Sequence, residues 1–260
     1  MKLKRQGLIL LLCFSVQSLV AQFSITSGGT DFIIDFNSYD GSTLSPTSPG
    51  ITSNDWAISG LRRADVDFGG TGDSRDFRGT APLQVDSGGV YAFEVDTGDY
   101  ALGFQPRGRY FTPGSMTLRI QNNTGGTITS LDMFHNLYVL NDTNRSTDFS
   151  FERSANNSTF TTVANYTSTL ASSGAPVEWL QLQLDVTFTD VSIAPGDFYY
   201  FRWSTDDGSG SGQFRDQFAI DNITMNAEVI PEPSTYVLIL GFASLALVLW
   251  KRSRRKASDA

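Results

Sequence analysis

The sequence predicts an all-β fold, a single β-sandwich, and three observations support it. Short runs in which apolar and polar residues alternate recur along the chain, and Gly, Asn, Asp, Ser and Pro separate them. No window of the segment 22–230 shows a helical period. The composition, with 40% hydrophobic and 18% charged residues in a chain of 260, is that of a globular protein.

Residues 1–21 have the layout of a secretory signal peptide. Three of the first five residues are basic, an apolar stretch covers 8–14, and Ser18 and Ala21 offer cleavage sites. The alternative, a buried N-terminal helix, would place three charges before a run of leucines without amphipathic spacing. We therefore expect passage through the secretion translocon and removal of this segment by signal peptidase.

The clearest predicted strand covers 180–188, where five apolar side chains alternate with polar ones and so share one buried face. Turn sequences such as Asn123–Gly126 and Asp206–Gly208 supply positive φ or local hydrogen bonds between strands. No charge block or proline-rich linker divides the body, so one domain over 22–229 is expected. Further strands are predicted at 32–36, 90–95, 100–105, 116–121, 128–140, 149–151, 198–203 and 218–225.

Residues 236–250 form an uncharged run of 15 residues. A helix of this length spans about 22 Å, against roughly 30 Å of hydrocarbon, so the run predicts a short, single transmembrane helix. A core helix is the alternative, but the run lacks a polar face. Cations beside a span stay in the cytoplasm, which would place the body on the far side of the membrane. These cations are Lys251, Arg252, Arg254, Arg255 and Lys256.

Pro231, Glu232 and Pro233 stand just before this run. The triplet, the apolar run and the basic tail, together 230–256, resemble the PEP-CTERM sorting signal of Gram-negative bacteria. The resemblance implies processing by an exosortase, an integral-membrane cysteine protease, near the triplet. It also implies delivery of the body to the cell surface or the exopolysaccharide matrix. Proline keeps the triplet extended, which suits presentation to a protease.

The closing strands carry a second resemblance. An aromatic strand ends in Phe201, Arg202 and Trp203, a Gly/Ser loop follows, and the last strand covers 217–224. These segments resemble secreted jelly-roll domains of the concanavalin or MAM type. The resemblance implies a jelly-roll-like sandwich and brings no catalytic motif.

Charge and cysteine content exclude several functions. The segment 22–230 carries 11 arginines, no lysine and 25 acidic residues, a net charge of −14, which repels phosphate backbones and argues against nucleic-acid binding. The only cysteine, Cys13, lies in the predicted signal peptide. The mature chain would then have neither a disulfide nor a thiol nucleophile.

The sequence offers few groups for catalysis, and we expect no enzymatic activity. His135 is the single histidine and lies in a predicted strand, where a structural role is favoured over a catalytic one. No Gly-x-Ser-x-Gly elbow is present, and one histidine cannot supply a usual zinc ligand set. Glycoside hydrolysis needs only two carboxylates and is hardest to exclude, although the Glu-x-Asp-x-x-Glu stretch of laminarinase-type glycosidases is absent.

Two kinds of binding site can be proposed from residue type. Asp206, Asp207 and Asp221 flank one loop and are candidates for a structural calcium ion; the alternative is a solvated acidic surface. Aromatic side chains stack on sugars, but they also fill sandwich cores. The candidates for sugar stacking are Trp56, Trp179 and Trp203, together with Tyr199 and Tyr200.

The sequence thus predicts an exported, exosortase-sorted surface or matrix protein with a non-catalytic β-sandwich, structural or adhesive in the exopolysaccharide matrix. The first alternative is a carbohydrate-binding module, lectin-like and assisted by calcium. A polysaccharide hydrolase is the second alternative, which the lack of a catalytic motif disfavours.

Overall fold

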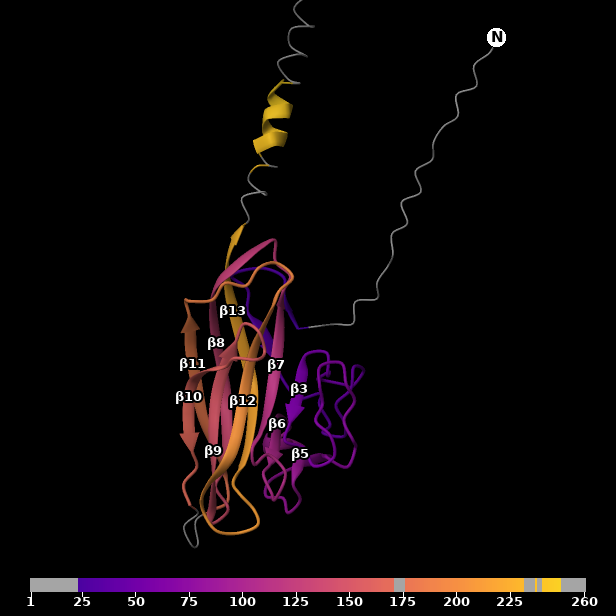
Figure 1. Ribbon diagram of the computed structural model, residues 1–260, viewed down its shortest axis with the longest axis vertical. Helices are drawn as coiled ribbons and strands as arrows, with labels where there is room; N and C mark the ends of the chain where they lie inside the picture. The colour runs from indigo at the N-terminus through magenta and orange to yellow at the C-terminus, as the bar shows by residue number, and fades with distance from the viewer. Residues whose placement is uncertain (1–22, 171–175, 232–236, 238–239, 249–260) are drawn as a thin grey trace, which may run out of the picture.

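The computed structural model describes residues 23–170, 176–231, 237 and 240–248 (Figure 1). Almost all regular structure in these residues is extended, as the alternating pattern predicts. The strands are β1 (Ser24–Ile25), β2 (Phe32–Ile34), β3 (Trp56–Ser59), β4 (Phe77–Ala81), β5 (Gly89–Asp96), β6 (Asp99–Gln105), β7 (Gly114–Asn122), β8 (Gly126–Leu140), β9 (Arg145–Ser154), β10 (Thr161–Thr167), β11 (Trp179–Phe188), β12 (Phe198–Gly210) and β13 (Gln217–Pro231).

The strands form two sheets that face each other, so the all-β sandwich prediction is confirmed. Sheet 1 has the order β1–β7–β12–β9–β10, and β3 also pairs with β7. Sheet 2 has the order β11–β8–β13–β6–β5–β4, and β2 also pairs with β13. From β7 onward the chain passes repeatedly between the sheets, since β8, β11 and β13 lie in sheet 2 and the others in sheet 1.

A continuous aromatic core fills the space between the sheets. Trp56 of β3 and Trp203 of β12 are both fully buried, and their rings stack with centroids 5.8 Å apart. Phe151 of β9 lies against Trp203 at 5.2 Å. Fully buried aromatic side chains contribute large apolar areas, so these contacts supply much of the stability that a chain without disulfides needs.

Most predicted strands are present, and four short or polar ones were not predicted. The alternating pattern at 116–121 becomes β7, and the pattern at 218–225 becomes part of the longer β13. The unpredicted strands, β1, β3, β4 and β10, have two to seven residues, and β10 has no clear alternation. They pair with longer neighbours, so long-range hydrogen bonds rather than local pattern select them.

Strand β11 shows how an edge position changes a strong pattern. It pairs with β8 alone, in an unbroken antiparallel register from Trp179 to Phe188. Its apolar face points inward as predicted, yet Leu180 remains 49% exposed and Leu182 and Leu184 only partly buried. Apolar alternation therefore gave the correct strand and face but overestimated the burial.

The C-terminal region is described only in part. Residues 240–248 are helical, and their apolar side chains, including Leu240 and Phe242, are more than half exposed. Among the described residues, no helix has the length and apolar character to cross a bilayer. Residues 1–22, Glu232, Pro233 and the tail 249–260, on which the signal-peptide, triplet and basic-tail predictions fall, lie outside the described residues.

Candidate functional site

A row of small polar side chains crosses the outer face of sheet 1. The row contains one residue from each of five adjacent strands, and each residue is the register partner of the next. Because neighbouring strands lie about 4.8 Å apart, the row is about 19 Å long and runs perpendicular to the strands. In order from β10 to β3 it consists of Asn165, Ser150, Ser204, Ser115 and Ser59.

Larger side chains flank this serine row on both sides. Glu152 and Arg202 are register partners and lie two residues from Ser150 and Ser204 along their strands, on one side of the row. Asp148 and Asp206, also register partners, lie two residues from Ser150 and Ser204 on the other side of the row. Each flanking row lies about 7 Å from the serine row, given the rise of an extended strand. The small residues therefore form a floor, and the longer ones form two walls.

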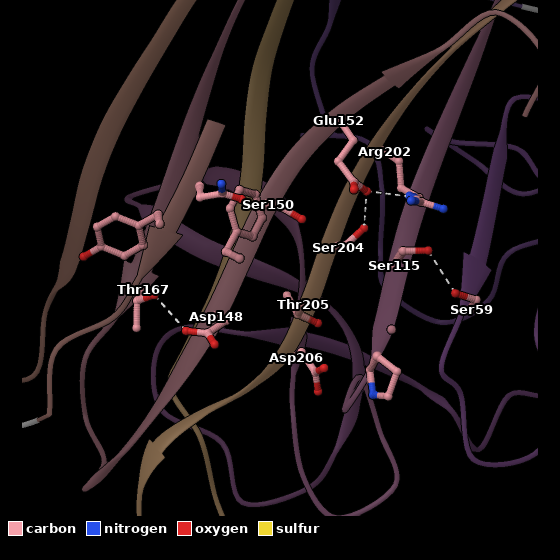
Figure 2. A pocket seen from close by; sticks show the side chains of 15 residues that line it. Ser59, Ser115, Asp148, Ser150, Glu152, Thr167, Arg202, Ser204, Thr205 and Asp206 are labelled. Carbon is pink, nitrogen blue, oxygen red and sulfur yellow. Dashed lines mark hydrogen bonds and ion pairs between the residues drawn. The ribbon is translucent and has the colours of Figure 1, made fainter. Parts of the chain in front are cut away.

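This arrangement produces a groove of about 630 Å³ (Figure 2). All five residues of the serine row line it, with Glu152, Arg202, Asp148 and Asp206. We call it the sheet 1 groove. Its size suits a small ligand or a few units of a polymer. The alternation of each strand explains its chemistry, because the residues between these positions, such as Phe149 and Trp203, point into the core.

Hydrogen bonds fix the walls of the groove. Arg202 Nε and Ser204 Oγ each donate to Glu152 Oε2, both at 2.7 Å. Thr167 Oγ1 donates to Asp148 Oδ1 at 2.7 Å, and one hydroxyl hydrogen bond of 2.9 Å joins Ser59 to Ser115 (Figure 2). Positioned hydroxyls and carboxylates offer both donors and acceptors, which suits a ligand rich in hydroxyl groups.

The groove carries more negative than positive charge. Three carboxylates line it, against the single guanidinium of Arg202, which is already paired with Glu152. Such a lining repels polyanions and leaves neutral or cationic ligands. Arg202 also covers the ring of Phe160, with the guanidinium carbon 3.6 Å from the ring centroid, so the wall has an apolar side as well.

The predicted sugar-stacking tryptophans do not lie at this groove. Trp56 and Trp203 are core residues with no exposed surface, so this structure leaves neither ring a face for a sugar. Trp179 lies in sheet 2, partly buried, with its ring centroid 5.1 Å from that of Phe93. Tyr199 is also buried. Tyr200 is partly exposed and lies near Phe68 on the outer side of sheet 1.

The predicted calcium ligands are not brought together. Asp206 and Asp207 belong to β12 in sheet 1, whereas Asp221 is buried in β13 of sheet 2. Arg215 Nε donates to Asp207 at 2.7 Å and Arg145 Nε at 2.8 Å, and these bonds lower the pKa of Asp207 to about 2. In the described part of the chain, no group of three or more His, Cys, Asp or Glu side chains could hold a metal ion.

His135 belongs to the core. Its side chain is 1% exposed, and its Nε2 accepts a hydrogen bond of 3.1 Å from Trp203 Nε1. Burial lowers its pKa to about 3, so the ring is neutral and acts as an acceptor between the sheets. It does not line the groove.

Sequence reasoning missed the groove because its floor consists of four serines and one asparagine that look like ordinary surface residues. Ser150 and Ser204 are polar residues between buried neighbours, and Asn165 lies in β10, which has no clear alternation. Only the register of five strands, which the sequence does not specify, places them in one row. No local signal distinguishes them.

The sorting triplet begins at the end of a strand. Pro231, its first residue, closes β13 and pairs with Gly126, the first residue of β8. Ile230, just before it, is 59% exposed. The folded sandwich therefore ends at the triplet, without an intervening linker.

Comparison with protein families matches residues 229–255 to the PEP-CTERM protein-sorting motif. The chain thus carries this sorting signal at the position that the triplet, apolar run and basic tail predicted. The motif implies export, association with the cell surface or membrane, and processing by an exosortase. It covers only the C-terminal segment and leaves the sandwich unassigned. No curated protein matches the chain.

Solved structures show weak similarity to the sandwich. The K1 cleaved adhesin domain of Lys-gingipain from Porphyromonas gingivalis W83 matches with a TM-score of 0.37 and 14% identity, over 77% of this chain and 99% of that one. The module CBM27-1 of Caldicellulosiruptor saccharolyticus, solved with mannohexaose, matches with a TM-score of 0.36 and 10% identity, over 77% of this chain and 99% of that one. A carbohydrate-binding module of family CBM28, specific for non-crystalline cellulose, matches with a TM-score of 0.36 and 11% identity, over 68% of this chain and 88% of that one.

Proposed function

We propose that this is an exported surface protein whose sandwich holds an extended, neutral polysaccharide chain in the sheet 1 groove, without catalysis. The protein would act as an adhesive or structural component of the extracellular matrix. The observation that carries the proposal is the serine row, because its five hydroxyl or amide side chains lie in register across five strands.

The shape and chemistry of the groove both favour a polysaccharide. A straight floor about 19 Å long fits a linear polymer better than a compact metabolite. The fixed hydroxyls and carboxylates match the donors and acceptors of a sugar chain. The negative lining disfavours charged polymers of the same sign, so the proposed ligand is neutral.

We further propose the following layout for the whole chain. Residues 1–21 are a signal peptide that directs secretion, 22–229 form one jelly-roll-like domain, and 230–256 are the sorting signal. Within that signal, 236–250 hold the chain in the membrane and the basic tail 251–256 stays in the cytoplasm. The matched motif supports this layout, and exosortase cleavage near 231–233 would release the body to the surface or matrix.

Catalysis is not part of the proposal. Glu152 Oε2 already accepts hydrogen bonds from Arg202 and Ser204, which gives this oxygen a structural role in the wall. Among the described lining residues, the other two carboxylates are Asp148 and Asp206, which are register partners. If the groove were a hydrolase site, the unmodified protein would form product from a polysaccharide and Asp148→Asn would not. We expect no product from either the unmodified protein or this variant.

The test is binding of the full chain, in neutral detergent, to soluble neutral polysaccharides by affinity electrophoresis and calorimetry. Ser150→Tyr fills the floor, and Ser150 makes no side-chain hydrogen bond that the change would break in the described part of the chain. We expect at least tenfold weaker binding, about 1.4 kcal/mol.

Two control variants show whether the effect comes from filling the floor of the groove. Gln183→Tyr introduces the same ring on an exposed position of β11, in the other sheet, and should leave affinity unchanged. Ser150→Ala keeps the floor open and should lose less than threefold. The proposal fails if the unmodified protein binds no neutral polysaccharide, or if Ser150→Tyr binds as tightly as Gln183→Tyr.

A further inference from the structure

A second opening, of about 500 Å³, collects four arginines that the sheet 1 groove does not use. The segment 22–230 has only 11 arginines and a strong acidic excess, so four around one opening are a marked local reversal of charge. We call this opening the arginine pocket. Its polar lining consists of Arg62, Arg78, Arg107, Arg109, Ser87 and Tyr110.

None of these four arginines forms an ion pair with a carboxylate in the part of the chain that the structure describes. The five ion-paired arginines are different ones, such as Arg145 and Arg202. Arg62 and Arg109 are exposed and make no side-chain hydrogen bond within the described residues. Their guanidinium groups therefore keep all their donors for a ligand.

The other two arginines are held in place by neutral groups. Arg78 Nε donates to the carbonyl oxygen of Gly88 at 3.1 Å, and its Nη2 donates to Tyr110 Oη at 3.3 Å. Arg107 donates to the carbonyl oxygen of Asp86 and stacks on Phe214, with the guanidinium carbon 4.3 Å from the ring centroid. These contacts fix the direction of each side chain without cancelling its charge.

Two carboxylates near the pocket, Asp76 and Asp86, accept hydrogen bonds from neighbouring protein groups. Asp76 is fully buried and accepts hydrogen bonds from Tyr110 Oη at 2.8 Å and from the backbone of Arg63 at 3.0 Å. Asp86 accepts from the hydroxyl of Ser87 at 3.2 Å. The described lining itself has four arginines and no carboxylate, so the walls of the opening are positively charged.

We propose that the arginine pocket binds an oxyanion group, a carboxylate or a sulfate ester, carried by a polysaccharide. Planar guanidinium groups pair bidentately with such oxyanions. A nucleic acid fits less well, because Tyr110, the one aromatic residue in the described lining, is buried and offers no face on which a base could stack. This site shares no lining residue with the sheet 1 groove, so it extends the proposed function and stands or falls separately.

The experiment measures binding of the full chain, in neutral detergent at low salt, to four probes. These are a hexamer of galacturonic acid, the same hexamer as its methyl ester, a sulfated hexasaccharide and a 20-nucleotide single-stranded DNA. We expect binding of the galacturonate or the sulfated probe, weakened at least fivefold by 0.5 M salt, and no binding of the methyl ester.

Neighbouring arginines supply matched variants. Arg62→Gln and Arg109→Gln remove exposed charges from the pocket and should each weaken binding at least fivefold. Arg63→Gln removes the same charge from the adjacent residue, which does not line the pocket, and should change affinity less than twofold. Unchanged thermal unfolding of all three variants would show that they remain folded.

Several results would overturn the proposal. These are no binding of either anionic glycan, equal binding of the acid and its methyl ester, or equal loss in Arg62→Gln and Arg63→Gln. Preferential binding of the DNA, weakened in Arg62→Gln, would mean that the ligand is a nucleic acid and not a polysaccharide.

The variant Ser150→Tyr distinguishes the two sites. If it still binds the anionic glycan, the arginine pocket acts independently of the sheet 1 groove.

Discussion

Glu152 and Arg202 lie opposite each other on β9 and β12, and Arg202 Nε donates a hydrogen bond of 2.7 Å to Glu152 Oε2. Ser204 Oγ donates to the same oxygen, also at 2.7 Å. The carboxylate side chain is only 13% exposed and the guanidinium 30%. This unit forms one wall of the sheet 1 groove and connects two central strands of sheet 1. Its loss should therefore affect both binding and stability.

Glu152→Gln should lower the free energy of unfolding by about 1–2 kcal/mol, because a half-buried guanidinium loses its charged partner. Urea unfolding of the full chain measures this. Glu178→Gln, at an exposed position before β11, is the control and should change stability by less than about 0.5 kcal/mol. Equal stability of the two variants would show that the pair contributes little.

Burial of Trp56 and Trp203 predicts how fluorescence responds to ligand. Neither side chain has exposed surface, so acrylamide should quench the partly buried Trp179 more than either core ring, and a bound neutral polysaccharide should not protect the two core rings. Trp203→Phe also removes the hydrogen bond to His135 and should cost about 1–3 kcal/mol of stability. Strong quenching of Trp56 in the variant Trp203→Phe, with the fold intact, would contradict its place in the core.

Asp221 should make stability depend on pH. Burial raises its pKa to about 7, well above the value of about 3.9 for an unfolded chain. Between these values the folded chain holds a proton that the unfolded chain releases. The contribution of this group is therefore complete below about pH 4 and is lost as the pH rises toward 7.

The variant Asp221→Asn removes this titration. The stability of the unmodified protein relative to Asp221→Asn should fall by at least about 1 kcal/mol between pH 4 and pH 7.5. Urea unfolding at a series of pH values gives the difference. Asp185→Asn removes an exposed carboxyl from β11 and is the control, and the change with pH should be larger for Asp221→Asn than for this variant. A flat profile for Asp221→Asn would mean that the buried carboxyl does not titrate in this range.

The start of β8 controls the end of the strand that leads into the sorting triplet. A Cβ atom on Gly126 would come within 2.3 Å of the carbonyl oxygen of Ile230, whereas on Gly125 it would meet nothing within 4 Å. Gly126→Ala should therefore separate the last residues of β13 from β8. A protease needs an extended, unpaired substrate, so processing in a native-type host should become faster.

Pulse-labelling followed by intact mass gives the rate at which the chain is shortened near 231–233. Gly125→Ala should be processed at the rate of the unmodified protein. Slower processing of Gly126→Ala would show that the paired strand end is itself part of what the protease recognises.

The sequence was most informative where the signal is local. The alternation at 180–188 gave β11 and its inward face, and the order of triplet, apolar run and basic tail gave the sorting motif. Residue type was a poor guide to sites, because Trp203 looks equally suitable for a core and for a sugar. The serine row depends on the registers of four strand pairs, and the arginine pocket on segments distant in sequence. Neither relation is encoded within a short window.

Strand β13 gives the sorting signal a mechanical setting. It lies in the interior of sheet 2, paired with β8 over most of its length and with β6 and β2 on its other edge. A chain held at its C-terminal end while its ligand is pulled away would load this strand along its axis. The force would then be shared by many backbone hydrogen bonds at once instead of opening them singly. Such a shear arrangement withstands an axial pull better than bonds that open one at a time, which would suit the adhesive role we propose.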